Sequence, residues 1–211
     1  MKLQRIMLLS VVGVCLFLTG CTATVRPQVS ETEFLTNEPK KPGRVDLYIT
    51  EEFRKHVETQ TDAMDLKKWE FELGPLAVDT FKYTLASRFE EVKVMLEPPN
   101  FPMAGDIEKN LLAVVHPEFA EFSCSFPVVF KFETYKSTVC FKVKVFDKTG
   151  SVLLDNSYTG VGEKRGSIGF ESAGHAANPI AAQLAVKDAV DKAVADIIKE
   201  VSKPTSAGLT N

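Results

Sequence analysis

The sequence predicts an α+β domain, in which a β-sheet packs against helices. Three observations lead to this prediction. Several segments alternate apolar and polar residues with the period of a half-buried strand, one segment repeats apolar residues at helical spacing, and a long alanine-rich helix lies near the end of the chain. Without its first 20 residues the chain keeps 191 of its 211 residues. This length favours one domain with a substantial core.

Two strands and a helix are predicted in the first half of the domain. Residues 45–50 alternate apolar and polar side chains, and so do residues 68–73. The weak, polar segment between them, 51–60, indicates at most a turn of helix. Gly74-Pro75 ends the second strand and begins the clearest helix, because proline is favoured at a first helical position. Its apolar stripe must pack on a sheet, and consists of Leu76, Ala77, Thr80, Phe81, Thr84, Leu85 and Phe89.

The second half is predicted to be rich in strands. A strand over 92–96 follows the helix, and the prolines of 98–102 exclude that loop from either kind of element. Further β regions are predicted at 111–115 with 119–122, at 128–146 and at 152–158. Asp147 to Gly150 forms the hairpin turn. The apolar positions change from even to odd numbers within 128–146, so we expect a bulge or turn near Thr134 to Ser137.

The end of the chain is predicted to be a helix. The glycine-rich residues 160–177 indicate a mobile crossover. Asn178-Pro179 then begins the long final helix. Its apolar stripe consists of Val186, Val190, Ala193, Ile197 and Val201.

The N-terminus has the pattern of a bacterial export signal. Lys2 and Arg5 precede an apolar run that ends at Leu18. This run is shorter than the about 20 residues of a transmembrane helix. The order Leu18-Thr19-Gly20-Cys21 resembles the lipobox of bacterial lipoprotein precursors, although an export signal can also contain a cysteine by chance, as Cys15 shows. The resemblance implies lipidation of Cys21, cleavage between Gly20 and Cys21, and acylation of the new amino end.

The signal divides the chain into four parts. We predict a signal peptide over 1–20, a lipidated Cys21 with a flexible tether over 21–44, a periplasmic α+β domain over 45–202 and a disordered tail over 203–211. Several acyl chains on one residue anchor a protein stably to a membrane. Thr22, where an aspartate would retain many such lipoproteins at the inner membrane, implies by the same resemblance an outer-membrane location.

The charge of the chain argues against nucleic acid as a partner. The formal net charge is −3, and it becomes −5 when Lys2 and Arg5 leave with the signal. An acidic surface is repelled by phosphate backbones. The compact basic clusters are Lys40-Lys41 with Arg44, and Lys164-Arg165. We interpret them as solvated charges, with contact to anionic lipid or polysaccharide as the alternative.

Two thiols remain in the mature domain, Cys124 and Cys140. The periplasm oxidises exposed pairs, but a tight turn near Ser125 would place Cys124 opposite Val128, far along the strand from Cys140. We therefore expect no disulfide and two thiols that behave as small hydrophobic side chains.

The sequence contains no pattern that predicts catalysis, a cofactor or a metal. Gly160-x-Gly162-x-x-x-Gly166 has the wrong spacing for a dinucleotide loop. His56, His116 and His175 are far apart and lack metal-ligand spacing. No nucleophile elbow occurs. The acidic residues Asp79, Glu90 and Glu91 are predicted to lie on a helix surface, and they fit a solvated surface better than an acid–base pair.

The order of these features resembles the YajG-like outer-membrane lipoproteins. The features are the lipobox, the 74–89 helix with its following strand, the 147–150 hairpin, the stretch Tyr158 to Gly162 and the alanine-rich helix that begins at Asn178. The resemblance implies a curved mixed or antiparallel β-sheet with two main helices packed on one face. It supplies no catalytic residues. The chain departs from the family pattern at 53–68 and 98–102.

Two functions are compatible with these features. The first is a non-catalytic accessory or scaffold module of an envelope assembly or export system, held by its lipid in the inner leaflet of the outer membrane and bound to an envelope protein. The second is a periplasmic carrier of an apolar or amphiphilic ligand, which requires a cavity between helices and sheet. Four phenylalanines near predicted loops could serve either function: Phe101, Phe119, Phe122 and Phe126.

Overall fold

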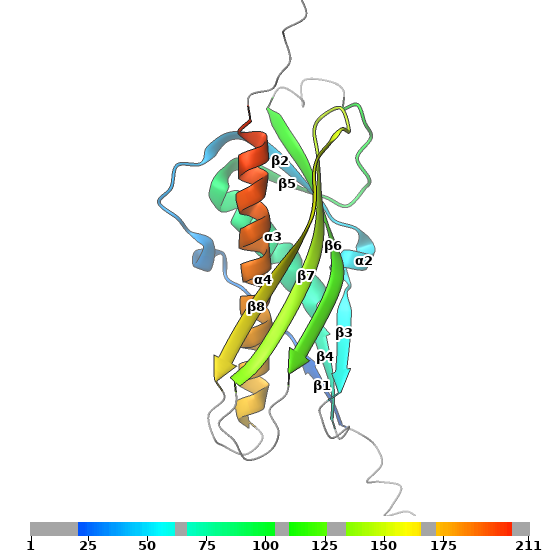
Figure 1. Ribbon diagram of the computed structural model, residues 1–211, viewed down its shortest axis with the longest axis vertical. Coiled ribbons are helices and arrows are strands. Elements are labelled where there is room, and N and C mark those ends of the chain that lie inside the picture. Colours follow the sequence, from blue (N-terminus) through cyan, green and yellow to red (C-terminus); the bar gives the residue numbers. More distant parts are fainter. Residues whose placement is uncertain (1–20, 62–66, 104–109, 126–133, 166–171, 204–211) are drawn as a thin grey trace, which may run out of the picture.

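The structure is a computed structural model that describes residues 21–61, 67–103, 110–125, 134–165 and 172–203. Within these residues the chain forms both strands and helices (Figure 1). In chain order they are β1 (Cys21–Val25), the 3₁₀ helix η1 (Glu31–Phe34), β2 (Lys41–Tyr48), α2 (Glu51–Arg54), β3 (Val57–Thr61), β4 (Lys67–Glu72), α3 (Leu73–Arg88), β5 (Phe89–Met95), β6 (Leu111–Ser125), β7 (Thr134–Phe146), β8 (Val152–Arg165) and α4 (Ser172–Val201).

The strands form two sheets. The larger has the order β5-β2-β6-β7-β8, and the smaller has the order β1-β4-β3. β2 is parallel to β5 and to β6, whereas β6, β7 and β8 are mutually antiparallel neighbours. In the smaller sheet β1 is parallel to β4, and β3 is antiparallel to it. The predicted α+β class is confirmed, and the sheets are mixed rather than purely antiparallel.

The short helix α2 separates the two sheets. It interrupts the line of β2 and β3, and its first turn is capped by the Thr50 hydroxyl, which accepts a bond from the Phe53 N–H at 3.1 Å. The Phe53 ring stacks on Phe119 of β6 at a centroid distance of 4.6 Å. Beyond this point β6 no longer pairs with β2 and is contacted by β3, where Gln60 Nε2 donates to the Phe122 carbonyl at 3.4 Å. The turn of helix predicted within 51–60 is therefore confirmed, but Val57–Thr61 form the strand β3, which the weak, polar pattern did not predict.

The helix α3 forms where the apolar stripe predicts it. It begins one residue before Gly74, and the stripe residues Leu76, Phe81 and Leu85 are buried. β5 follows it directly, as predicted, but begins at Phe89, which the prediction placed in the helix, and not at residue 92. Together, α3 and α4 are the two main helices on one face of the sheets (Figure 1).

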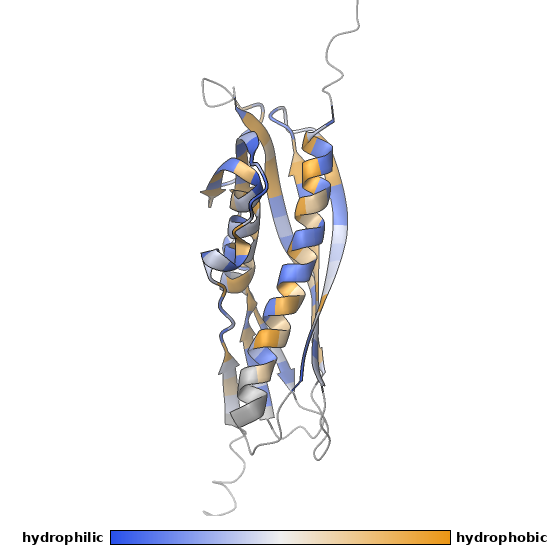
Figure 2. Ribbon diagram, turned by 90° about the vertical axis from the view of Figure 1, so that its left-hand side faces the viewer, coloured by the Kyte–Doolittle hydropathy of each residue, from blue (hydrophilic) through white to orange (hydrophobic). Residues whose placement is uncertain are grey.

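The helix α4 begins at Ser172, six residues before the predicted start, and Pro179 lies inside it. Apolar and hydrophilic residues alternate along its length in Figure 2. Most of its valine stripe is buried in the core: Val186, Val190 and Ile197 are fully inaccessible to solvent, whereas Val201 is half-buried. The alanines between them, such as Ala185 and Ala189, are equally buried. Small side chains let the helix backbone lie close to the sheet.

Gly160 and Gly162 provide the other half of this close contact. They lie in β8, not in the mobile crossover that the sequence predicts. A Cβ atom on Gly160 would lie 2.0 Å from the Ala185 carbonyl oxygen, and one on Gly162 would lie 2.0 Å from that of Ala181. The glycines therefore allow α4 to pack on the strand, which is a steric role and not one of backbone freedom.

Side chains of α4 also bond to the backbone of β8, an edge strand of the larger sheet. Asp188 Oδ2 accepts a hydrogen bond from the Val161 N–H at 3.1 Å, and Lys192 Nζ donates to the Thr159 carbonyl at 2.9 Å. These two bonds use backbone groups with which another strand could pair. The helix thus covers both the inner face of β8 and part of its edge.

The hairpin of β6 and β7 has a different register from the predicted one. Cys124 pairs with Ser137, and Cys140 pairs with Glu121, so the two thiols lie apart along the strands. Both cysteines are free, as predicted. The burial of side chains along β7 alternates without a break from Thr134. The predicted irregularity in strand pairing lies instead in β6, between Phe119 and Glu121. The predicted strand residues 128–132 lie outside the described residues.

The segment before the predicted domain is not a flexible tether in its described part. β1 pairs with β4, and η1 and the start of β2 follow it before residue 44. Val25 and Phe34 are buried, at 4% and 7% exposure. A five-residue strand with one apolar anchor has too weak a pattern for prediction, because its stability comes from tertiary pairing. The 203–211 tail lies outside the described residues from 204 onward.

Candidate docking groove

Cys21, the residue predicted to be lipidated, lies in an edge strand of the smaller sheet. Cys21 is the first residue of β1, and its Cα is in register with that of Lys67 in β4. Gly20 lies outside the described residues. Among the described helices, none has the length and apolarity needed to cross a bilayer. Lipidation at Cys21 and cleavage before it remain predictions from the sequence.

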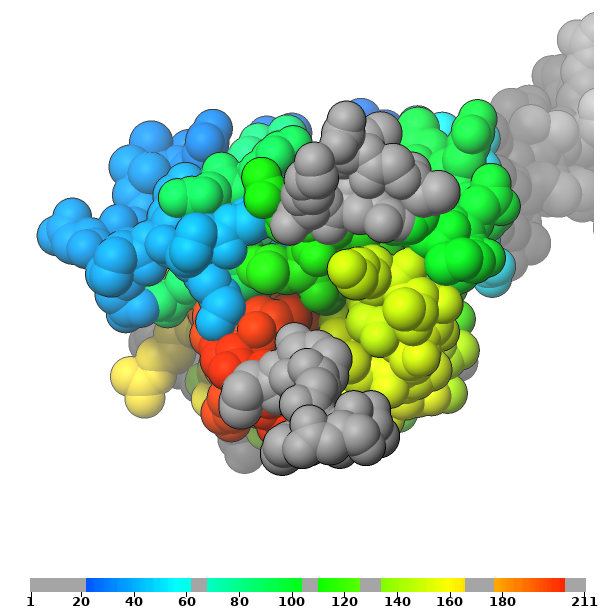
Figure 3. Space-filling view, turned by 90° about the horizontal axis from the view of Figure 1, so that it is seen from above, coloured from blue at the N-terminus to red at the C-terminus, as the bar shows by residue number. Residues whose placement is uncertain are grey.

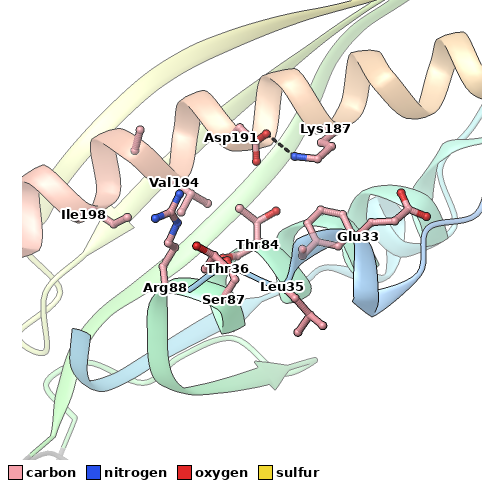
Figure 4. A pocket seen from close by; sticks show the side chains of 12 residues that line it. Glu33, Leu35, Thr36, Thr84, Ser87, Arg88, Lys187, Asp191, Val194 and Ile198 are labelled. Carbon is pink, nitrogen blue, oxygen red and sulfur yellow. Dashed lines mark hydrogen bonds and ion pairs between the residues drawn. The ribbon is translucent and has the colours of Figure 1, made fainter. Parts of the chain in front are cut away.

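An open groove lies on the helical face, and we call it the α3–α4 groove. It has a volume of about 530 Å³ and lies between α3, α4 and residues 33–36 of the N-terminal segment. Val194, Ala195 and Ile198 of α4 supply its apolar side. Thr84 and Arg88 extend from α3 toward α4 on the facing side (Figure 4).

The N-terminal segment is held over the two helices by one aromatic side chain. The Phe34 ring lies 5.9 Å from the Tyr83 ring of α3, and the Lys187 ammonium of α4 lies 5.3 Å from its centroid. Beside it, Gln183 Nε2 donates to Glu33 Oε2 at 2.9 Å. The segment therefore contributes a fixed wall to the α3–α4 groove.

The two cations that line the α3–α4 groove are each paired with a carboxylate. Lys187 Nζ lies 2.6 Å from Asp191 Oδ2, and Arg88 forms an ion pair with Glu38 (Figure 4 shows the first pair). A cation that is already paired offers little to an anionic ligand. The groove thus lacks the uncompensated charge that a phosphate or carboxylate site requires.

Two features of the α3–α4 groove suit a protein ligand. The Thr84 hydroxyl is buried and has no hydrogen-bond partner among the described residues, whereas Thr80, one turn earlier, donates to the Leu76 carbonyl at 2.7 Å. A buried polar atom without a partner can be satisfied by a docked group. At the mouth, the Leu35 side chain is 76% exposed. One exposed leucine is ordinary in itself, but here it lies beside an apolar wall.

A second hollow, of about 320 Å³, lies between α2 and β6. It brings together His56 and His116, which are distant in sequence. The His56 ring stacks on Phe119 at 4.0 Å, and its Nε2 lies 2.9 Å from Glu58 Oε1. The His116 ring lies 4.8 Å from that of Tyr48. The sequence does not predict that the two histidines lie close together, because no local pattern indicates the interruption between β2 and β3 that places His56 beside β6.

The burial of His116 should make the stability of the fold depend on pH. Burial lowers the pKa of His116, and the Glu118 carboxylate opposes that shift. A histidine whose pKa is lower in the folded state destabilises that state when it is protonated. We therefore expect thermal stability to fall as the pH drops below about 6.5, the unfolded value. His116→Gln should reduce this loss, measured by melting at about pH 7.5 and 5.5. An unchanged loss in the variant would contradict the assignment.

No metal centre is recognisable among the described residues. No cluster of three His, Cys, Asp or Glu side chains that could hold a metal ion occurs among them. The side chain of His175 lies outside the described part. Cys124 is buried, and burial raises the pKa of its thiol, so it is a poor nucleophile.

The three described members of the phenylalanine set do not form one cluster. Phe119 packs with Phe53 and His56, Phe122 lies 5.0 Å from Phe71, and Phe101 lies 5.7 Å from Phe146. Phe126 lies outside the described residues. These rings are separate packing contacts because β6 and the 98–102 loop distribute them over different parts of the molecule. The three described phenylalanines therefore provide no single surface for a ligand or a partner.

The α3–α4 groove was not predicted from the sequence, because one of its walls belongs to the presumed tether. One sequence pattern does indicate local structure in this segment. Ser30 to Glu33 has the spacing of a capping box, and the Ser30 N–H donates to Glu33 Oε1 at 3.1 Å. An aromatic residue directly after such a box indicates a short helix with a buried side chain, which is the role of Phe34.

Comparison with known proteins gives a shared fold only. No protein-family model and no curated protein matches the sequence. Protein XCC0632 from Xanthomonas campestris superposes with a TM-score of 0.51 and 10% identity, over 84% of this chain and 96% of its own. Protein CT253 from Chlamydia trachomatis superposes with a TM-score of 0.49 and 13% identity, over 78% of this chain and 100% of its own. A minor lipoprotein from Acinetobacter baumannii superposes with a TM-score of 0.37 and 10% identity, over 75% of this chain and 92% of its own. The chain thus resembles XCC0632 in fold.

Proposed function

We propose that this chain is a lipid-anchored, non-catalytic accessory module of the bacterial envelope. In this proposal Cys21 is acylated after cleavage at Gly20 and holds the domain in the inner leaflet of the outer membrane, facing the periplasm. An envelope protein docks in the α3–α4 groove. The anchor rests on the N-terminal sequence pattern, and the docking function rests on the geometry of the domain.

The observation that carries the docking function is the position of the α3–α4 groove at the surface of the domain. A carrier of apolar ligands needs a chamber between helices and sheet. Here α4 lies so close to β8 that a Cβ atom at Gly160 would lie 2.0 Å from the helix backbone. The hollow of about 530 Å³ is instead open at the helical surface. Its paired charges and apolar wall resemble the mixed character of a protein interface.

A photo-crosslinking amino acid at Leu35 tests docking directly. Leu35 lies at the mouth of the α3–α4 groove, and Leu184 of α4, which does not line it, is a matched exposed leucine. We expect one discrete protein adduct at Leu35 in native envelopes and none at Leu184. Adducts of equal intensity at both positions, or none at either, would contradict docking in the groove.

Native mass spectrometry of the full chain separates the accessory function from that of a carrier. We expect the mass of the acylated polypeptide without an additional noncovalent lipid. One retained apolar molecule per chain would favour the carrier instead.

A further inference from the structure

We propose that the end of the domain at which β1 begins rests on anionic lipid headgroups, with Lys164 and Arg165 in contact with their phosphates, so that the long axis stands upright on the membrane. This inference rests on the proposed lipidation of Cys21. It adds an orientation and a lipid contact that the anchor alone does not specify.

The first step is the position of the anchor. Cys21 is already part of β1, and its Cα is in register with Lys67 of β4. No length of free chain lies between the acylated residue and the folded sheet. The lipid chains would therefore emerge directly from one end of the smaller sheet, and that end must lie at the headgroups.

The second step is the set of elements that share this end. The registers place the end of β3 beside the start of β4, the end of β6 beside the start of β7, and the end of β8 beside that same start. Figure 1 shows these strand ends and the start of α4 together at the bottom of the molecule. We call this end the anchor pole, defined by Cys21, Thr61, Ser125, Thr134, Arg165 and Ser172.

The third step is charge. Lys164 and Arg165 are the last two residues of β8, are exposed, and form no ion pair with any described residue. Lys68, beside Thr61 at the same pole, is also exposed, and its Nζ lies 4.0 Å from Glu70. The chain as a whole is acidic, with a net charge of −3. Exposed cations within about 10 Å of an anionic surface are attracted to it.

The fourth step is length. α4 has 30 residues and therefore extends about 45 Å from the anchor pole. The opposite pole, seen from above in Figure 3, contains the end of α4 and the hairpin of β7 and β8. The α4 residues of the α3–α4 groove, 187–198, lie about 20 to 40 Å above the anchor pole. An upright domain thus presents the groove well clear of the lipid.

Chemical footprinting of the full, acylated chain tests this orientation. The chain is incorporated in vesicles of phosphatidylcholine alone or with one fifth phosphatidylglycerol, and its lysines react with a membrane-impermeant ester. Because an anionic surface keeps nearby amines protonated, we expect Lys164 to react about fivefold more slowly in the phosphatidylglycerol vesicles. Lys148, in the hairpin turn at the opposite pole, should react equally in both.

A charge variant separates lipid contact from simple proximity. Lys164→Gln with Arg165→Gln should still float with the vesicles, but the slowing at Lys68 by phosphatidylglycerol should diminish. Lys148→Gln is the matched control and should leave that slowing unchanged. Any of three results would overturn the proposal. They are equal reactivity of Lys164 in both kinds of vesicle, slowing at Lys148 in place of Lys164, and slowing at Lys68 that is as large in the double variant as in the wild type.

The same preparation distinguishes failure of the anchor from failure of the orientation. A chain without acyl groups does not float with the vesicles, and the mass of its N-terminal peptide lacks the lipid. That result would refute the proposed lipidation. A chain that floats and carries the lipid, but whose Lys164 is not slowed, would refute the orientation alone.

Discussion

Gly160→Val should lower the free energy of unfolding by about 3 kcal/mol. A side chain at this position meets the backbone of α4, since even a Cβ atom would lie 2.0 Å from the Ala185 oxygen and 2.4 Å from the Ala189 nitrogen. Backbone atoms cannot rotate away, so the helix must move off the strand and lose its alanine contacts. Denaturant unfolding followed by circular dichroism measures the effect.

Thr159→Val is the matched control, because Thr159 is the neighbouring residue of β8 and its side chain is exposed. It should change stability by no more than about 0.5 kcal/mol. If Gly160→Val is as stable as this control, α4 does not lie as close to β8 as the structure shows, and the argument against an interior chamber weakens with it.

Val190→Asp should lower the free energy of unfolding by about 3 kcal/mol or more. Val190 is fully buried in the valine stripe of α4, and a carboxylate there has no cation to pair with inside the core. The melting temperature of the full chain should fall accordingly. This outcome identifies the stripe as a structural surface that docks on the sheet.

Leu184→Asp is the control on the same helix, since Leu184 is 41% exposed. It should leave the melting temperature nearly unchanged, and so should deletion of residues 203–211. If Val190→Asp melts like the wild type but loses the crosslinked partner, the stripe would be an interaction surface and the packing of α4 described above would be wrong.

Local patterns predict the elements that carry their own periodicity. α3, β4, β5 and the turn at Asp147 to Gly150 each bury one regular face or contain a defined turn, so few residues suffice to identify them. In the turn, Asp147 Oδ1 accepts bonds from the Thr149 N–H at 2.8 Å and from the Ser151 N–H at 2.9 Å. Such interactions lie within a few residues of one another and are visible in the sequence.

Elements stabilised by distant partners were missed. β1 and η1 each have one buried apolar residue, Val25 and Phe34, whose packing depends on β4 and on the two main helices. Gly160 and Gly162 were misassigned because glycine indicates backbone freedom and close packing equally in a sequence. The α3–α4 groove could not be predicted, since its walls come from three separate segments, whereas the Cys21 prediction needs only four consecutive residues.

The site of acylation is the most direct test of this account. Cells that express the full chain are grown with labelled palmitate, and the mature protein is digested for mass analysis of its N-terminal peptide. We predict that the wild type incorporates label and begins at Cys21 with lipid attached, that Cys21→Ser incorporates none, and that Cys140→Ser incorporates as much as the wild type. Equal label in the wild type and in Cys21→Ser would contradict the account.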